Sequence, residues 1–456
     1  MSAYEEFLAA KMPRARAVGI AGIDEFPAEF FPHQRHCAEF ALRQGRAGIY
    51  LDTGLGKTAI ELAFGHHAAL ATNGQALMLV PLAVAQQAKR EADRFGFDAR
   101  VIREQAQARP GINICNYDRL DKLDVAKFGG VILDEASILK AYTGKTSRAL
   151  IGAFAGHRFR MTATATPAPN DHMELGQQCE FLGVMPSNEM LMRWFVADQT
   201  QMGRYRLKHH GEADFWRWMA SWSRMAENPA DLGFDGARFV LPPLDIRYHH
   251  ADATDVAPLA GSLFEIVMSA TTLHDVKRQT ATARAEAVAS IVASTPGPAV
   301  IWCDTDYEAA AIAKAFPEAI EVRGSHPIER KEEALEAFAT GAARVLLTKP
   351  SICGYGLNWQ HCSTMVFAGR SFSYESWYQA VRRCWRYGQT RPVTAHVIVA
   401  EGETQIAAAI ARKADDHARM KAAMAQAMRI AMADDEARLV RAYEPTHRGA
   451  LPAWLQ

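Results

Sequence analysis

The chain has 456 residues, which is too many for one ordinary domain and suits two or three. Hydrophobic residues make up 49% and charged residues 22%, the composition of a globular protein with a full core. The formal net charge is +0, which excludes a protein that is basic overall, so any basic track for nucleic acid must be local.

The cysteines and the apolar segments point to a cellular compartment. Seven cysteines are scattered without any Cys-x-x-Cys pair, which argues against a zinc ribbon or a disulfide framework and favours a reducing cytoplasm. No apolar stretch approaches the roughly 18 residues of a membrane helix. Glu5 and Glu6 stand where a secretory signal carries basic residues. We expect a cytoplasmic protein with no membrane partner.

Short apolar runs alternate with helical patterns in two blocks of the chain, which predicts parallel-sheet α/β lobes. The strands expected in the first block are Gly48–Leu51, Ala76–Val80, Ile112–Cys115, Gly130–Leu133 and Phe159–Thr162. The strands expected in the second block are Ala299–Cys303, Ile320–Arg323, Val345–Thr348, Thr364–Phe367 and Val393–Val399.

The pattern changes between and after these blocks. Long helical patterns rich in Trp, Met and Arg follow the first block, and an Ala-rich stretch of mixed charge follows the second. The predicted organisation is a first lobe with its N-terminal segment over residues 1–184, a helical insertion or linker over 185–289, a second lobe over 290–403 and a helical C-terminal extension over 404–456.

The middle region contains basic residues beside aromatic ones, a mixture that can grip nucleic acid. Its basic cluster consists of Arg204, Arg206, Lys208, His209 and His210. Phe215, Trp218, Met219 and Trp222 fall at i, i+3, i+4 and i+7, so we expect them to face a core. The basic cluster stays open between a DNA contact and a solvated face. A metal site at the paired histidines is not expected.

A glycine-rich turn at residues 51–58 lies between a predicted strand and a predicted helix, which is the context of a phosphate-binding P-loop. In such a loop, backbone N–H groups and the helix N-terminus bind phosphate oxygens. The residues expected to bind the nucleotide are Thr53, Gly54, Leu55, Gly56, Lys57 and Thr58. Lys57 would reach the β- and γ-phosphates, and Thr58 would bind Mg²⁺. A chance Gly-x-Gly-Lys-Thr turn is the alternative.

Two carboxylates follow an apolar strand downstream of the P-loop. At the carboxyl edge of a parallel sheet, Asp134 would hold Mg²⁺ through its water shell. Glu135 points elsewhere and would polarise the attacking water as a general base. An exposed acidic turn after a buried strand is the common alternative, but its pairing with an upstream P-loop favours the catalytic interpretation.

A segment rich in arginine, residues 379–389, lies in the second block. Helical spacing places Gln379, Arg383 and Arg386 on one face, and guanidinium groups from a facing lobe would stabilise the charge of phosphoryl transfer. A surface helix with solvated arginines is the alternative. Arg382 points away from this face, so we expect a solvated position or a DNA-backbone contact there. The expected catalytic residues are Lys57, Asp134, Glu135, Gln379, Arg383 and Arg386.

These motifs, in this order, resemble those of superfamily 2 helicases. The finer resemblance is to the Swi/Snf-like branch, and within it to compact DEAD/DEAH-type helicases encoded by phages and prophages. The segments that carry it are residues 31–34, 51–58, 81–84, 116–117, 134–148, 161–175, 349–362 and 379–389. Ala136 and Ser137 depart from the Ala-His or Gly-His of many relatives, which puts the coupling of ATP state to DNA grip in doubt.

The resemblance implies an α/β fold of two RecA-like lobes that close on ATP and Mg²⁺. It implies that Gln34 and Gly356 also bind the nucleotide. The residues implied to contact nucleic acid are Pro81, Leu82, Asn116, Tyr117, Thr164, Thr166, Lys349 and Asn358. For Thr164 and Thr166, a Thr-rich strand end before a proline is the alternative.

The expected function is that of an ATP-dependent translocase on double-stranded or branched DNA. The protein is expected to work as a monomer and to bind DNA mainly through the DNA backbone. The expected location is the cytoplasm, and if a phage encodes the chain, the cytoplasm of its bacterial host. Two alternatives stay open. One is an RNA or single-strand helicase with the same motor core, and the other is a nucleic-acid clamp that does not hydrolyse ATP.

Overall fold

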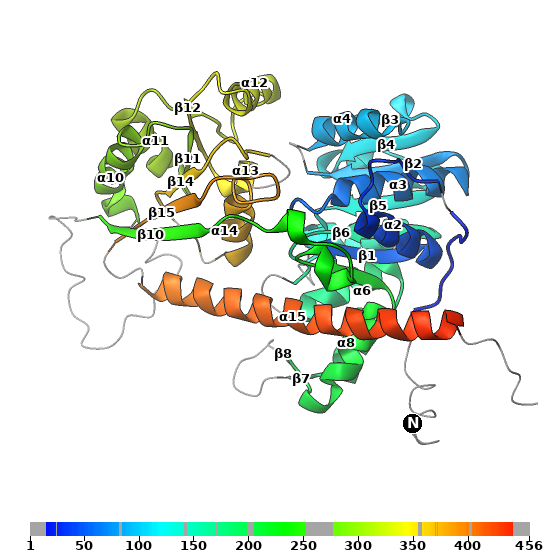
Figure 1. Cartoon of the computed structure of the whole chain (residues 1–456). Helices are drawn as coiled ribbons and strands as arrows, with labels where there is room; N and C mark the ends of the chain where they lie inside the picture. The colour runs from blue at the N-terminus through cyan, green and yellow to red at the C-terminus, as the bar shows by residue number, and fades with distance from the viewer. Residues whose placement is uncertain are drawn as a thin grey trace, which may run out of the picture.

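Two α/β lobes lie side by side above one long C-terminal helix in the computed structural model of the chain (Figure 1). The structure describes residues 15–23, 25–81, 84–140, 144–168, 172–197, 205–251, 277–353, 358–369, 371, 373–400 and 404–440. The expected α/β class with two RecA-like lobes and a helical C-terminal extension is confirmed.

The first lobe is built on a parallel seven-stranded sheet with the order β3-β4-β2-β5-β6-β1-β9. Its strands are β1 (Arg46–Leu51), β2 (Gln75–Val80), β3 (Ala99–Val101), β4 (Gly111–Asn116), β5 (Gly130–Asp134), β6 (Phe159–Ala163) and β9 (Ser223–Ala226). Its helices are α2 (Pro32–Gln44), α3 (Lys57–Leu70), α4 (Ala85–Phe95), α5 (Lys145–Phe154), α6 (Leu175–Leu182), α7 (Ser187–Trp194) and α8 (Glu212–Ala220). All five strands expected in this lobe are present, with ends that shift by at most two residues.

The second lobe has a parallel six-stranded sheet with the order β10-β15-β14-β11-β13-β12. Its strands are β10 (Leu244–His250), β11 (Ala299–Trp302), β12 (Ile320–Glu321), β13 (Val345–Thr348), β14 (Thr364–Phe367) and β15 (Val393–Val399). Its helices are α10 (Ala281–Ala293), α11 (Asp306–Ala315), α12 (Ile328–Ala339), α13 (Pro350–Cys353) and α14 (Tyr374–Val381). The five strands expected here are also present.

The middle region differs from the expected run of long helices. It contains α7 and α8, but also a β7–β8 hairpin (Phe195–Ala197 and Tyr205–Leu207) and the strands β9 and β10. β9 pairs with β1 at the edge of the first sheet, whereas β10 pairs with β15 at the edge of the second. The middle region therefore extends both sheets, and the chain crosses between the lobes in the short segment from β9 to β10.

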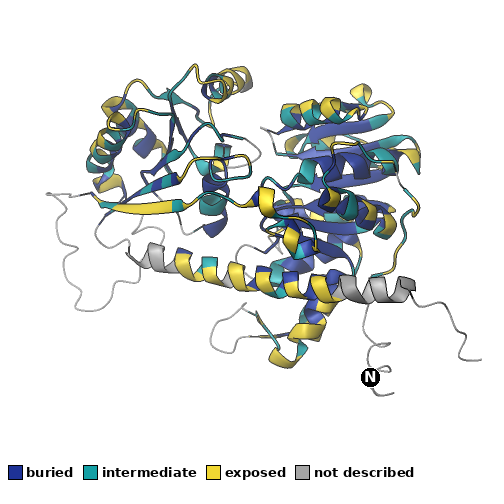
Figure 2. Cartoon of the chain, viewed as in Figure 1, coloured by how far each residue is buried: buried dark blue, intermediate teal, exposed yellow. Residues whose placement is uncertain are grey.

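Burial explains why the core strands read as continuous apolar runs. Central strands of a parallel sheet are covered on both faces, and those of both lobes are buried along nearly their whole length, whereas the edge strand β10 is mostly exposed (Figure 2). The aromatic stripe of α8 is buried as expected: Phe215, Trp218, Met219 and Trp222 are each at most 1% exposed. All seven cysteines are buried and unpaired.

The C-terminal helix α15 (Thr404–Val440) bridges the two lobes. Ile410, near its start, packs against Tyr374 of α14 in the second lobe. Met420, Met424 and Met428 join the core of the first lobe, where α15 contacts α8 and β9. None of the helices in the described part of the chain combines the length and the apolar character that crossing a bilayer requires.

Candidate functional site

The P-loop connects β1 to α3 and depends on two glycines. Gly54 and Gly56 have φ values of 90° and 80°, in the left-handed region that side chains other than glycine rarely adopt. A Cβ atom on Gly56 would lie 1.9 Å from Nε2 of Gln34, and one on Gly54 would lie 2.8 Å from Cβ of Tyr387 in the second lobe. Glycine is therefore needed at both positions, because the backbone is left-handed there and neighbouring side chains leave little room for a Cβ atom.

Lys57 begins α3 at the end of this loop. Its ammonium donates to the carbonyl oxygens of Leu51 at 2.8 Å and Asp52 at 3.4 Å. Burial lowers the pKa of Lys57, and the nearby carboxylates of Glu135, Asp52 and Asp134 oppose this shift. A half-buried cation beside backbone N–H groups at a helix start is suited to bind phosphate.

The two carboxylates lie at the end of β5, as the sequence predicts. Burial raises the pKa of Asp134 to about 6 and that of Glu135 to about 7. Glu135 has φ 56° and is the only non-glycine residue with positive φ among those described, and Thr164 Oγ1 donates to its Oε1 at 2.6 Å. Since this conformation is costly, the surrounding structure must enforce it. A carboxylate with a pKa near 7 is suited to general-base catalysis.

The acidic residues around the P-loop fit a magnesium ion. Thr58, Asp134 and Glu91 line one cavity, and burial raises the pKa of Glu91 and of the nearby Glu61. Glu61 is fully buried, and both its carboxylate oxygens lack a hydrogen-bond partner in the described part of the chain. The cluster of carboxyl groups and the unpaired oxygens of Glu61 therefore suit a cation, which when bound would favour the ionised carboxylates. The described residues form no group of three or more metal-ligating side chains. Magnesium is commonly held by one or two carboxylates together with substrate phosphates, and Asp134 and Thr58 are the residues that could hold it here.

The aromatic rings of Phe31 and Tyr387 also line the cavity. The ring of Phe239, on the crossing segment, stacks on Tyr387 with centroids 4.5 Å apart and lies edge-on to Phe31 and His33. Gln34 accepts the backbone N–H of Phe31 at 3.0 Å, and its amide donates to the carbonyl of Leu55 at 3.3 Å. Gln34 thus ties the P-loop to this aromatic wall. Contact with a base edge stays a prediction for it.

The arginine segment reaches the cavity without forming the expected helical face. α14 ends at Val381, and residues 382–388 form turns, so the predicted i, i+4, i+7 stripe does not exist. Arg383 nevertheless reaches back to Gln379, with Nη2 donating to Oε1 at 3.0 Å and Nε donating to the carbonyl at 2.9 Å. Burial lowers the pKa of Arg386 to about 9, and the positive charges of Arg383 and Arg382 add to the shift.

Arg382 corrects the sequence interpretation, because it is neither solvated nor on an open face. It is 3% exposed, and its Nη2 pairs with Asp52 Oδ2 at 2.6 Å. Its Nε donates to Thr53 Oγ1 at 2.6 Å. The guanidinium of the second lobe therefore holds the P-loop of the first. The helix end at Val381 redirects this side chain, so helical spacing could not reveal it.

One cavity of about 290 Å³ brings together five of the six predicted catalytic residues, all except Gln379, from the two lobes. Its lining includes Gln34, Thr53, Gly54, Gly56, Lys57, Thr58, Asp134 and Glu135 of the first lobe and Asn358, Arg383 and Arg386 of the second. Gln379 lies behind it, with its amide 3.5 Å from Thr166 Oγ1. A phosphate chain at the P-loop would thus face the arginines from the opposite lobe.

Thr164 and Thr166 lie inside the protein, although the resemblance implies that they contact nucleic acid. Both are fully buried. Thr164 bonds to Glu135 and accepts the backbone N–H of Thr166 at 3.1 Å, and Thr166 contacts Gln379. They form a short hydroxyl path from the general-base candidate to the second lobe.

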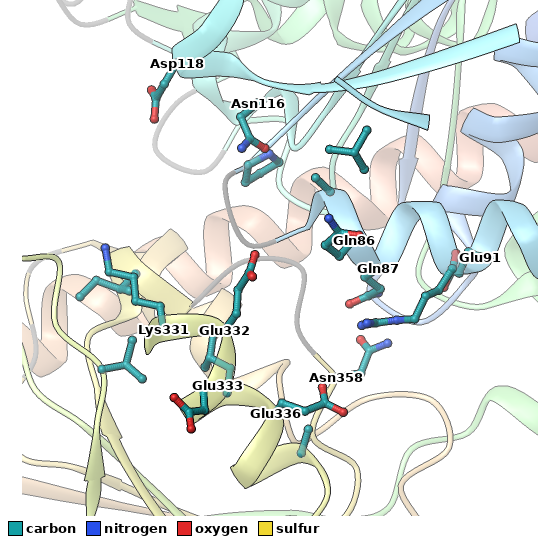
Figure 3. Close-up of a pocket in the computed structure, with 18 of the residues that line it drawn as sticks. Gln86, Gln87, Glu91, Asn116, Asp118, Lys331, Glu332, Glu333, Glu336 and Asn358 are labelled. Carbon is teal, nitrogen blue, oxygen red and sulfur yellow. The ribbon is translucent and has the colours of Figure 1, made fainter. Parts of the chain in front are cut away.

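A second and larger space of about 940 Å³ lies between the lobes (Figure 3). Pro81, Asn116 and Asn358, three of the predicted nucleic-acid residues, line it. The wall from the first lobe includes the arginines at positions 90, 94, 103 and 119. The wall from α12 in the second lobe carries Glu332, Glu333 and Glu336 beside Lys331. We call this space the interlobe groove.

The other predicted nucleic-acid residues have different positions. Tyr117 donates its hydroxyl to the carbonyl of Asp134 at 2.8 Å, so it supports the acidic pair from the groove side. Lys349 pairs with Asp306 at 2.9 Å in the second lobe and lines a small separate pocket. Leu82 and Gly356 lie outside the described residues, as does Arg204 of the basic cluster.

Comparisons with known proteins agree with this arrangement. Residues 283–388 match the model of the helicase conserved C-terminal domain. The second lobe matches a helicase domain. The structure of Dbp5 from S. cerevisiae bound to RNA and ADP BeF3 is similar at a TM-score of 0.55 and 12% identity, covering 87% of this chain and 93% of that one. This similarity supports the two-lobed fold.

A second solved structure has a lower TM-score. The Sulfolobus solfataricus SWI2/SNF2 ATPase core in complex with dsDNA aligns at 0.40 with 15% identity, over 90% of this chain and 96% of that one. A search of curated proteins by sequence gives no match.

Several residues of the site were missed by the sequence analysis. Phe239, Tyr378 and Lys421 lie on the crossing segment, on α14 and on α15, and all three reach the P-loop or its neighbours. No local pattern marks them, since each acts only through contacts between segments far apart in the sequence.

Proposed function

We propose that the chain is an ATP-dependent DNA translocase of the Swi/Snf-like type, which hydrolyses ATP between its two lobes. The observation that carries this proposal is the cavity into which Lys57, Asp134 and Glu135 project from one lobe and Arg383 and Arg386 from the other. The helicase-domain match over residues 283–388 supports it independently.

The residues around the cavity divide the chemistry of phosphoryl transfer among them. Backbone N–H groups of the P-loop and the ammonium of Lys57 would bind the β- and γ-phosphates. Thr58 and Asp134 would hold Mg²⁺, which when bound neutralises phosphate oxygens. Glu135 takes a proton from the attacking water, whose oxygen bonds to the γ-phosphorus as the bond to the β–γ bridging oxygen breaks.

Arg383 and Arg386 would stabilise the charge that develops on the γ-phosphoryl oxygens. Because these arginines belong to the second lobe, full catalysis requires the lobes to be closed. Release of phosphate removes the charge that attracts the arginines, so each turnover opens and closes the molecule.

Nucleic acid would lie in the interlobe groove, where closure changes the distance between two gripping surfaces. The arginines at positions 90, 94, 103 and 119 offer contacts to phosphates, which carry no sequence information. Binding should therefore be independent of sequence and weaken with salt. Duplex DNA is favoured as the track by the resemblance of residues 134–148 and 161–175 to the Swi/Snf-like motifs.

The test is ATP turnover by the full chain with duplex DNA, single-stranded DNA or RNA at matched salt. We expect duplex DNA to stimulate turnover most. The Glu135→Gln variant, purified in the same way, measures the ATP turnover that comes from contaminating enzymes. Stimulation by RNA alone would replace DNA with RNA as the substrate. Nucleic-acid binding without turnover under any condition would indicate a clamp instead of a motor.

A further inference from the structure

The C-terminal helix places one buried lysine in the contact between the lobes. Lys421 of α15 has a side chain that is 4% exposed. Its ammonium donates to Tyr378 Oη of the second lobe at 3.1 Å and pairs with Glu227 Oε1 of the first lobe at 2.8 Å. Figure 1 shows α15 running beneath both lobes, and the two bonds of Lys421 join this helix to one residue of each lobe. A buried ammonium needs such partners, because its desolvation is costly.

The contact continues from Lys421 into the P-loop. Tyr378 donates its hydroxyl to Oδ1 of Asp52, the first residue after β1. The same Oδ1 accepts the backbone N–H of Thr53 at 2.6 Å, while Oδ2 pairs with Arg382. Side chains from α14 and α15 thus fix the two residues that precede Gly54.

The charges along this path alternate in sign. The ammonium of Lys421, the carboxylate of Asp52 and the guanidinium of Arg382 are all at least nine-tenths buried. Burial opposes ionisation of Asp52, but Arg382 and Lys421 hold its pKa below the ordinary value. Removal of one cation would leave the negative charge of Asp52 only partly compensated. The P-loop that carries Asp52 would then be free to shift.

We propose that α15 sets the geometry of the nucleotide-binding loop through Lys421, Tyr378 and Asp52, so that a docked helix is required for tight ATP binding. This inference rests on the proposed ATPase function. Lys421 and Tyr378 are positioning residues, since both act on the nucleotide through Asp52 and Thr53. An event that lifts α15 from the first lobe would therefore weaken ATP binding without altering any catalytic side chain.

The experiment uses the full chain with Lys421→Met and Tyr378→Phe, alone and together. The affinity for a fluorescent ATP analogue and the KM and kcat of ATP hydrolysis are measured for each. We expect KM and the Kd of the analogue to rise about tenfold, because the loss of one hydrogen bond to a charged group weakens binding by about this factor. The kcat at saturating ATP should stay near the wild-type value. The double variant should show little more than the larger single effect, because the two side chains act in one path.

Arg429→Met is the matched control, because it removes a cation from an exposed position on the same helix. Tyr378→Phe keeps the ring and its packing, so it tests the path even where Lys421→Met lowers the thermal midpoint. Unchanged KM in Tyr378→Phe, equal shifts in Arg429→Met or fully additive effects would each overturn the inference and leave the ATPase intact. A wild-type chain that neither binds nor hydrolyses ATP would overturn the proposed function as well.

Discussion

Both lobes are built on a parallel sheet, but the turn from β1 to α3 in the first lobe differs from the turn from β11 to α11 in the second. After β1, the chain forms the P-loop, and the N–H groups at the start of α3 face the cavity. After β11, the backbone N–H groups of Asp304 and Thr305 both donate to Oε2 of Glu308, at 2.9 Å each. Glu308 is 1% exposed. The second lobe thus supplies its own anion where the first leaves room for phosphate.

This difference assigns unequal tasks to the lobes. The buried carboxylate of Glu308 would repel a phosphate at this helix start, so the second lobe contributes arginines instead of a phosphate site. The first lobe should therefore supply the direct contacts to the ATP phosphates, whereas hydrolysis should also need the arginines of the second lobe. Variants on each side of the cavity can separate these two steps.

The largest effect is expected from the second lobe. Arg383→Ala should lower ATP turnover on the order of 10³-fold to 10⁵-fold, the range measured for loss of an arginine finger. ATP binding should change far less, because the P-loop is intact. Single-turnover hydrolysis and equilibrium binding on the same preparation check this. Equal losses in both would mean that Arg383 shapes the ground-state site.

Glu135→Gln comes next and tests the first lobe. Turnover should fall about 10²-fold to 10⁴-fold, the usual contribution of a positioned general base. ATP should remain bound, because the amide keeps the hydrogen bond to Thr164. Retention of radiolabelled ATP after rapid gel filtration measures this. Turnover at the wild-type rate would refute the role of Glu135.

Arg382→Gln tests the contact that sequence reasoning missed. Breaking one side of a buried ion pair costs on the order of 3 kcal/mol, so ATP affinity should fall up to about 100-fold as Asp52 loses its partner. Lys89→Gln is the control, since its ion pair with Asp93 lies at the surface of α4 and should contribute little. Isothermal titration of ATP into both variants gives the comparison.

The smallest effect is a pH dependence. Burial raises the pKa of Glu135 to about 7, so the base is protonated below that pH and ionised above it. Values of kcat/KM should therefore rise with pH and fall about tenfold per unit below pH 7. The same raised pKa means that this residue stabilises the fold at low pH and loses that contribution as pH rises through about 7. A flat profile from pH 6 to 8 would assign the base elsewhere.

The sequence predicts the core of each sheet well, because buried parallel strands carry a strong apolar signal. It does not predict β9, which has only four residues, or β10, which is mostly exposed and carries no continuous apolar run; the two strands pair with β1 and β15. The same limit applies to the middle region, where helical aromatic spacing is real but two strands flank the crossing segment.

The residues of the candidate site also fall into those that the sequence predicts and those that it does not. Asp134 and Glu135 lie at the end of β5, and Lys57 begins α3 after the loop that follows β1, as their motifs predict. Arg383 and Arg386 reach the cavity even though the expected helix ends at Val381. The roles of Arg382 and of the buried threonines depend on turns and contacts between lobes, and these have no periodic signature in the chain.

The burial of every native thiol has a practical consequence. Burial raises the pKa of Cys37 to about 12 and that of Cys115 to about 11, and thiols held in the neutral form react slowly with maleimides. Cysteines introduced at exposed positions, such as Leu70 on α3 and Ser290 on α10, would then take up nearly all of the dye. Fluorescence energy transfer between them would follow the movement of the lobes in real time without prior removal of any native cysteine.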